Sequence, residues 1–253
     1  MARRLLLQDW HAQARRAWLM VSLWLAVSAG TLSAQTIIES ADFTHPTTAY
    51  RHGVLGDAVE YSGLRAQLSD GRAVALRFAE GGRVFEDLQP RLWDVTGDDA
   101  PEIVVIETDP PQGAQLAIYT VSNGTLRKLA ATPHIGRTHR WLAPIGAADL
   151  DQDGAIEIAY VDRPHLAKTL RIWRFTDATL QPVADRRGLT NHRIGEAFIS
   201  GGLRTCAGTP ELITADANWS QIVATTLQNG AIKTRPVGPF TGPSSFAAAL
   251  DCK

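Results

Sequence analysis

The chain has 253 residues, 45% of them hydrophobic and 20% charged, and a formal net charge of −1. This composition excludes a disordered chain and suffices for one substantial core. Without the N-terminal segment described next, which holds four arginines and one aspartate, the charge becomes −4. An acidic chain argues against a nucleic acid or an anionic membrane as a partner.

Residues 1–34 have the pattern of a secretory signal peptide. Arg15 and Arg16 precede an apolar run from Ala17 to Ala29, and the small residues up to Ala34 offer a cleavage site. A membrane anchor is the alternative, but the run is shorter than the roughly 20 residues of a spanning helix. We therefore expect a periplasmic or secreted protein with one domain, residues 35–253, and no stable membrane insertion.

A repeat of about 53 residues runs through the predicted domain. An acidic stretch followed by a short apolar strand occurs as DVTGDDAPEIVVIE (94–107), as DLDQDGAIEIAYVD (149–162), and without the leading acids as PELITAD (210–216). The glutamates that open these strands, Glu102, Glu157 and Glu211, stand 55 and 54 residues apart. A constant spacing of this kind indicates a repeat protein.

Each repeat continues with a predicted β-hairpin. Two β-rich segments flank a turn at Asn123, Asp177 and Asn229, and Asp70 supplies an earlier copy. Asn-Gly and Asp-Gly between alternating apolar segments are strong hairpin signals. Four antiparallel strands per repeat are typical of a β-propeller blade.

The two ends of the chain predict how the blades close. The first unit, from about Tyr50 to Phe78, lacks a first strand, and the C-terminal FAAALD (246–251) resembles the first strands of the other units. We expect this last strand to complete the N-terminal blade, because closure removes exposed sheet edges. The expectation is an all-β protein, a small β-propeller of four, or alternatively five, four-stranded antiparallel blades. An open sandwich is the alternative architecture.

The two cysteines, Cys206 and Cys252, take similar places in neighbouring blades of such a ring. In an oxidising compartment we expect a disulfide between them that fastens the ring shut. The alternative is two buried free thiols.

The stretch DLDQDGAIE favours a calcium loop. Asp149, Asp151 and Asp153 alternate, a glycine follows at the sixth place, and Glu157 opens the next strand, so carboxylate oxygens can surround a hard cation. The helix-loop-helix calcium hand is excluded, because its twelfth place would be Tyr160. An empty acidic turn is the alternative.

These motifs resemble the FG-GAP or VCBS repeat family, the calcium-loop propeller blades also found in the head of integrin alpha chains. The resemblance is closest over residues 89–176. It implies a β-propeller with calcium after the first strand of some blades, and it implies no particular reaction. The first loop departs from the pattern, so its site, comprising Asp94, Thr96, Asp98 and Glu102, should bind calcium more weakly.

Two further sets of polar residues recur at equivalent places. Glu107, Asp162 and Asp216 end the second strands, where they could surround a channel or bond to their own turns. A second set, in THRW and NHRI, precedes the first strands of successive blades and could form a basic pocket for an acidic sugar or a carboxylate, or be ordinary interblade loops. This set comprises His139, Arg140, His192 and Arg193.

The function expected from these patterns is an exported, non-catalytic, calcium-binding propeller that acts as a binding or scaffolding module for an unknown protein or glycan ligand. The alternative is a periplasmic propeller enzyme that acts on an acidic glycan or carboxylate through the His and Arg loops. An enzyme should bring His139 or His192 within hydrogen-bond reach of an acid.

Overall fold

The computed structural model describes residues 35–253, and Thr36–Lys253 form one compact unit. The predicted signal peptide, residues 1–34, lies outside the described residues. The described fold is all-β with one short helix, in agreement with the predicted class. Within it, no helix has the length and apolar character needed to span a membrane.

Seventeen strands fall into four consecutive units along the described chain. The first unit contains β1 (Ile38–Thr47), β2 (Glu60–Leu68) and β3 (Ala73–Arg77). The second contains β4 (Val84–Phe85), β5 (Arg91–Trp93), β6 (Glu102–Asp109), β7 (Gly113–Ser122) and β8 (Thr125–Ala131). The third contains β9 (Leu142–Ala148), β10 (Glu157–Asp162), β11 (Thr169–Thr176) and β12 (Thr179–Arg187). The fourth contains β13 (Leu189–Thr190), β14 (Gly202–Cys206), β15 (Thr209–Asp216), β16 (Gln221–Gln228) and β17 (Ala231–Pro239), and helix α1 (Pro243–Leu250) follows it.

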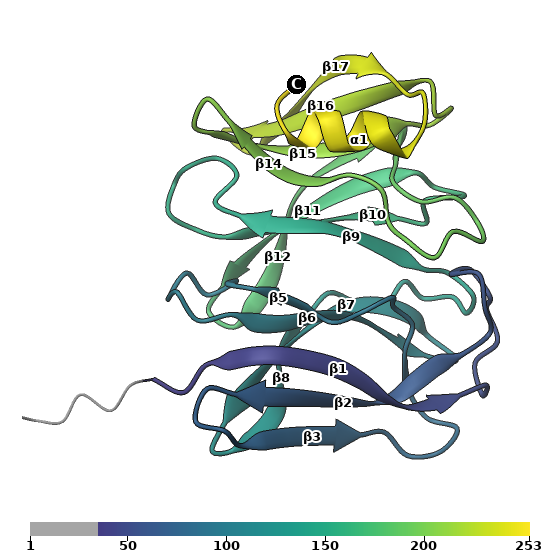
Figure 1. The fold of residues 1–253 in the computed structure, drawn as a ribbon, viewed down its shortest axis with the longest axis vertical. Coiled ribbons are helices and arrows are strands. Elements are labelled where there is room, and N and C mark those ends of the chain that lie inside the picture. Colours follow the sequence, from purple (N-terminus) through teal and green to yellow (C-terminus); the bar gives the residue numbers. More distant parts are fainter. Residues whose placement is uncertain (1–34) are drawn as a thin grey trace, which may run out of the picture. The chain divides into compact units, whose positions relative to one another are not determined.

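All strand pairs are antiparallel, and they form three sheets of eight, four and five strands. The eight-stranded sheet joins the first two units, because the short β4 pairs with both β2 and β6. Figure 1 shows the units following one another in a row, from purple to yellow. Neighbouring units cover both faces of the second strands, so β6 and β10 are buried along almost their whole length.

The first strand is continuous in the third unit and interrupted in the second and fourth. β9 pairs along all of β10. By contrast, β4 and β5 pair with opposite ends of β6, and β13 and β14 pair with opposite ends of β15. The residues between these short strands, 86–90 and 191–201, leave the sheets as loops.

The predicted hairpin turns are present in the second to fourth units. Asn123, Asp177 and Asn229 have φ of 51°, 49° and 51°, and the residue after each also has positive φ. Positive φ at both central positions is the requirement of a type I′ turn, which asparagine, aspartate and glycine tolerate best. The register also makes Glu102, Glu157 and Glu211 equivalent, since each pairs with a residue near the end of the preceding first strand.

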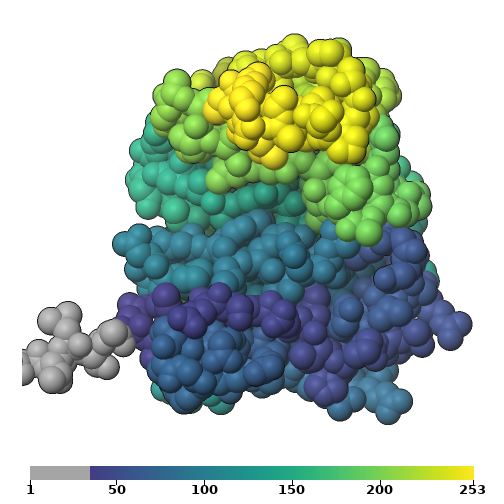
Figure 2. All heavy atoms as spheres, viewed as in Figure 1, coloured from purple at the N-terminus to yellow at the C-terminus, as the bar shows by residue number. Residues whose placement is uncertain are grey.

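The prediction of a closing C-terminal strand is wrong. The segment FAAALD lies in α1, whose Phe246 and Ala249 are buried against Ile213 and Ile222 of the last sheet. Pro243, three residues before this segment, suits the first turn of a helix, and alanine, which fills positions 247–249, has the highest helix propensity. The first and last units lie at opposite ends of the row (Figure 1), and α1 forms the outer layer of the last one (Figure 2).

The predicted disulfide between Cys206 and Cys252 is present, with 6.0 Å between the Cα atoms. Its expected place between neighbouring blades is wrong, because both cysteines belong to the last unit. Cys206 ends β14 and Cys252 follows α1, so the bond attaches the helix to its own sheet. Arg204 of β14 supports this attachment by donating to the carbonyl oxygen of Ala249.

We expect the double substitution Cys206→Ser and Cys252→Ser to lower stability. The disulfide closes a loop with a sequence separation of 46 residues. In the chain-entropy model such a loop is worth roughly 3–4 kcal/mol. The measurement is urea unfolding of the oxidised protein and the variant, with the reduced wild-type protein as control. Equal midpoints for all three would contradict the expectation.

Candidate functional site

The acidic loop between β9 and β10 brings three predicted calcium ligands together. Asp149, Asp151 and Asp153 each offer a carboxylate oxygen within 4.8 Å of the others. Asp149 shapes the loop, because its two carboxylate oxygens accept the backbone N–H groups of Asp153 and Gly154 at 3.0 and 2.9 Å. Three convergent carboxylates fit a hard divalent cation.

An arginine already contacts this cluster. The guanidinium of Arg174, on β11, donates to both oxygens of Asp151 at 3.0 Å, lies 2.8 Å from Asp153 and donates to Glu157 at 2.5 Å. Glu157, the fourth predicted ligand, is not part of the convergent set. Its other oxygen accepts the N–H of Leu150 at 2.9 Å. A cation at this loop would therefore compete with Arg174 for two aspartates.

The loop between β5 and β6 has similar hydrogen bonds to its backbone, but its carboxylates do not converge. Asp94 accepts the N–H groups of Gly97 and Asp99, and Glu102 accepts the N–H of Val95 at 3.0 Å. No convergent group of acids forms here within residues 35–253. Burial is the main cause that raises the pKa of Glu102.

The fourth unit has a two-residue turn, Ala207 and Gly208, in place of an acidic loop. Glu211 there is held by Arg204 of β14, at 2.5 and 2.8 Å, and by Arg235 of β17 at 2.6 Å. Two arginine side chains thus supply positive charge to Glu211, a partnership that the sequence did not predict.

The repeated acids at the ends of the second strands have structural roles. They are equivalent, since Glu107, Asp162 and Asp216 pair with Phe85, Leu142 and Leu189. Asp216 accepts the N–H groups of its own turn, at Ser220 and Gln221. The other two form ion pairs with basic side chains. Glu107 pairs with Lys128 and Arg83, and Asp162 pairs with Arg163 and Arg171.

The predicted His and Arg set divides into two places. Arg193 lies over the rings of Trp219 and Phe240, at 4.4 and 4.7 Å from their centroids. Arg140 instead lines a small pocket together with His139. His192 is buried beside Trp141, and its nitrogens contact His165 and the backbone oxygen of Glu196. The rings of His139 and His192 thus make no hydrogen bond to a carboxylate in the described part of the chain.

Two histidines that the sequence reasoning missed complete this pocket. His52 and His165 line it together with His139 and Arg140. The Nδ1 atom of His52 bonds to the buried carboxylate of Glu86, whose other oxygen accepts the hydroxyl of Thr108 at 2.6 Å. Neither histidine lies in a repeated motif, and Glu86 is 34 residues from His52, so no local pattern indicated the pair.

The loops that line the pocket meet segment 191–201, which holds His192 against His165 without lining the pocket itself. The N–H of Gly195 donates to the carbonyl oxygen of Val54, which joins segments 50–59 and 191–201. Figure 2 shows these green and purple-blue segments side by side. The loop before β9 joins them, because Tyr50 accepts the N–H of His139 at 2.6 Å.

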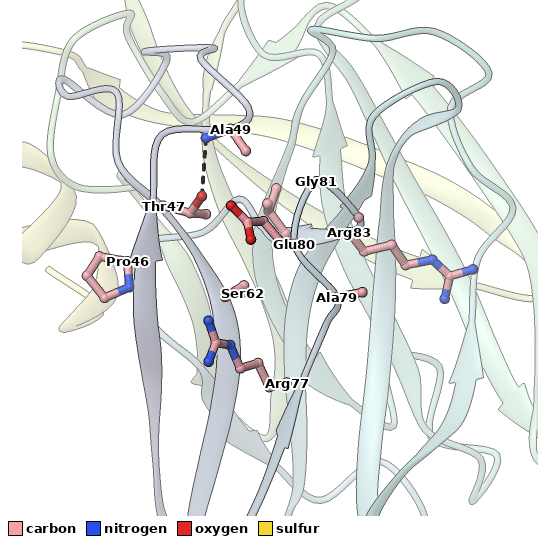
Figure 3. A pocket seen from close by; sticks show the side chains of 11 residues that line it. Pro46, Thr47, Ala49, Ser62, Arg77, Ala79, Glu80, Gly81 and Arg83 are labelled. Atoms are coloured by element: carbon pink, nitrogen blue, oxygen red, sulfur yellow. Dashed lines mark hydrogen bonds between the residues drawn. The ribbon is translucent and has the colours of Figure 1, made fainter.

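A second, larger cavity of about 220 Å³ lies between the end of β1 and the loop that follows β3. Figure 3 shows Glu80 beside Thr47, while the side chain of Arg83 points away from them. That arginine bonds instead to Glu107 and Asp109. The charged side chains that face the cavity, Arg77 and Glu80, are exposed, so the cavity is a less developed site than the histidine pocket.

A search with models of known protein families gave no match, and a search among curated protein sequences gave none either.

A buried acid lies behind the histidine pocket. Glu60, at the start of β2, is 3% exposed. Burial, together with the negative charges of Glu86, Asp57 and Asp87, raises the pKa of its carboxyl to about 9. The folded protein therefore keeps a proton on Glu60 that the unfolded chain releases at its ordinary pKa.

Because the folded state holds this proton, we expect the free energy of unfolding to fall as the pH rises. Between pH 5 and 9 the folded state binds more protons at Glu60 than the unfolded state, so alkaline conditions favour unfolding. Glu60→Gln cannot ionise, and we expect its unfolding midpoint to decrease less over this range. The measurement is urea unfolding at pH 5, 7 and 9. The exposed Glu80→Gln serves as control and should follow the wild type; identical profiles for Glu60→Gln and wild type would contradict the expectation.

Proposed function

We infer that the chain is an exported, non-catalytic binding module built from propeller-type blades of the FG-GAP or VCBS kind, and that it binds calcium. The observation that carries this inference is the convergence of Asp149, Asp151 and Asp153 in the loop that leads into β10. Oxygen-rich loops of this kind suit calcium, which takes six to eight oxygen ligands. Such an ion would hold the loop in place and neutralise the cluster.

Export is supported by the disulfide between Cys206 and Cys252, since disulfides persist in oxidising compartments. A binding role is supported by the loops at the ends of the strands, because loops on a rigid repeat scaffold carry recognition. The ligand proposed is a protein or a glycan.

A second candidate function is an enzyme that acts on an acidic glycan or another carboxylate. The contact between His52 and Glu86 favours it, because a buried carboxylate that orients an imidazole is a common arrangement in general acid–base catalysis. His52 faces the pocket that contains His139 and Arg140. Among the described residues no serine, threonine, cysteine, lysine or carboxylate lines that pocket, so such an enzyme would act by proton transfer or on water.

We expect calcium to raise the thermal unfolding midpoint of residues 35–253. A ligand that binds only the folded state stabilises it. The measurement is the midpoint in chelator and across a calcium titration up to millimolar concentrations, the affinity range of extracellular modules. The double substitution Asp149→Ala and Asp151→Ala should abolish the rise.

Two arginine variants sharpen the calcium test. Arg174→Ala removes the competing guanidinium, so it should be less stable in chelator and gain more from calcium than the wild type. Arg171→Ala is the matched control on the same strand, because it contacts Asp162 and Asp185 and not the acidic loop. The absence of any shift in wild type and in Arg174→Ala would contradict a calcium site.

The enzyme candidate predicts turnover of an acidic oligosaccharide. Products would be detected by mass spectrometry after incubation with the wild-type protein, and His52→Asn would remove the activity. Product formation that persists in His52→Asn would exclude this site as its source.

A further inference from the structure

The histidine pocket has a lining of positive and neutral groups. Its walls include His52, His139, Arg140, Arg163, His165 and Leu166, and within residues 35–253 no aspartate or glutamate belongs to them. Its volume of about 40 Å³ leaves room for a few water molecules or a carboxylate group, and not for a whole sugar ring. The rim carries Leu166, which is 65% exposed and offers an apolar surface.

One arginine of the pocket has a charge that no carboxylate neutralises within the described chain. Arg140 donates to the carbonyl oxygen of its neighbour His139 at 2.6 Å. Arg163, by comparison, is held by Asp162 through two hydrogen bonds of 2.7 and 2.9 Å. A half-buried guanidinium without a counter-charge favours an anionic ligand, and carboxylates match its planar donors.

The hydrogen bonds around His192 determine the tautomer of His165. The Nε2 atom of His192 lies 2.8 Å from the carbonyl oxygen of Glu196, which only accepts, so this nitrogen carries the proton. Its Nδ1 atom then accepts from the Nε2 of His165 at 2.9 Å. In a neutral His165 the remaining nitrogen, Nδ1, is consequently a hydrogen-bond acceptor.

His165 stays neutral under ordinary conditions. Burial, together with the neighbouring His192, lowers its pKa to about 4. The Nδ1 atom of His52 contacts the Glu86 carboxylate, so its Nε2 atom is the ring nitrogen left to face a ligand. The pocket thus combines donors for an anion with one fixed acceptor.

We propose that this pocket binds the carboxylate of a hydroxy acid, such as the uronic acid unit of an acidic glycan. The carboxylate would bond to Arg140 and His52, and a neighbouring hydroxyl would donate to Nδ1 of His165. The Leu166 rim would contact the apolar face of the sugar. This proposal rests on the binding role inferred above and does not depend on calcium.

The test is isothermal titration calorimetry of residues 35–253 with glucuronate, glucose and acetate. Glucuronate should bind more tightly than acetate, and glucose should not bind measurably, because it lacks the carboxylate. Arg140→Gln should weaken glucuronate binding about tenfold or more, since it removes a charge-assisted hydrogen bond. His165→Phe should bring the affinities for glucuronate and acetate closer together, because it removes the hydroxyl acceptor.

Matched controls separate this proposal from the calcium proposal. Arg127→Gln changes an exposed arginine on β8 and should bind glucuronate like the wild type. The titrations are repeated in chelator and in calcium, and the thermal midpoint of each variant verifies folding. No glucuronate binding, or equal binding by Arg140→Gln and wild type, would overturn the hydroxy-acid site even if calcium stabilises the fold. Glucuronate binding without any calcium effect would support the pocket and contradict the calcium loop. A longer acidic oligosaccharide that binds better than glucuronate would identify a polymer as the source of the ligand.

Discussion

A buried carboxylate requires hydrogen-bond donors, and one such carboxylate recurs at the start of the second strand in three consecutive units. Glu102, Glu157 and Glu211 are all buried between neighbouring strands. In the first two, one oxygen accepts the N–H of the second residue of the preceding loop, Val95 or Leu150, which fixes how that loop leaves the first strand. In the third, arginines replace the loop. The acidic loops thus provide hydrogen-bond donors that the buried glutamates of this fold need.

The regular features of this fold could be predicted because they are local. The turns at Asn123 and Asn229 need positive φ, and the strands between them need an apolar sequence, so both leave a pattern in the sequence. The disulfide was predicted because its two cysteines take similar places in two repeats, although it joins α1 to its own sheet and does not link two blades. The C-terminal helix was missed because FAAALD is apolar enough for either element, and only helix propensity and the packing of Phe246 distinguish them.

The site could be predicted only in part, and the reason is distance along the chain. Asp149, Asp151 and Asp153 are close in sequence, so their convergence was foreseeable. Arg174 was not expected as their partner, because it lies on β11, which pairs with the strand that follows the loop, β10. His52 and Glu86 likewise meet through loops that follow no period. Sequence patterns indicate which chemical groups recur, whereas contacts between loops depend on the assembled units.

The interruptions of the first strands have a consequence for how such a protein could change its ligand. Loop 86–90 contributes Glu86, and loop 191–201 contributes His192, while the uninterrupted β9 contributes no such loop. In the second and fourth units the second strand maintains the register, because it pairs with the short strands on both sides of the interruption. Asp87 and Asn191 bond to strand backbones and are fixed. The exposed residues of these two insertions can vary without shifting a strand, so new specificities can arise there while the scaffold stays the same.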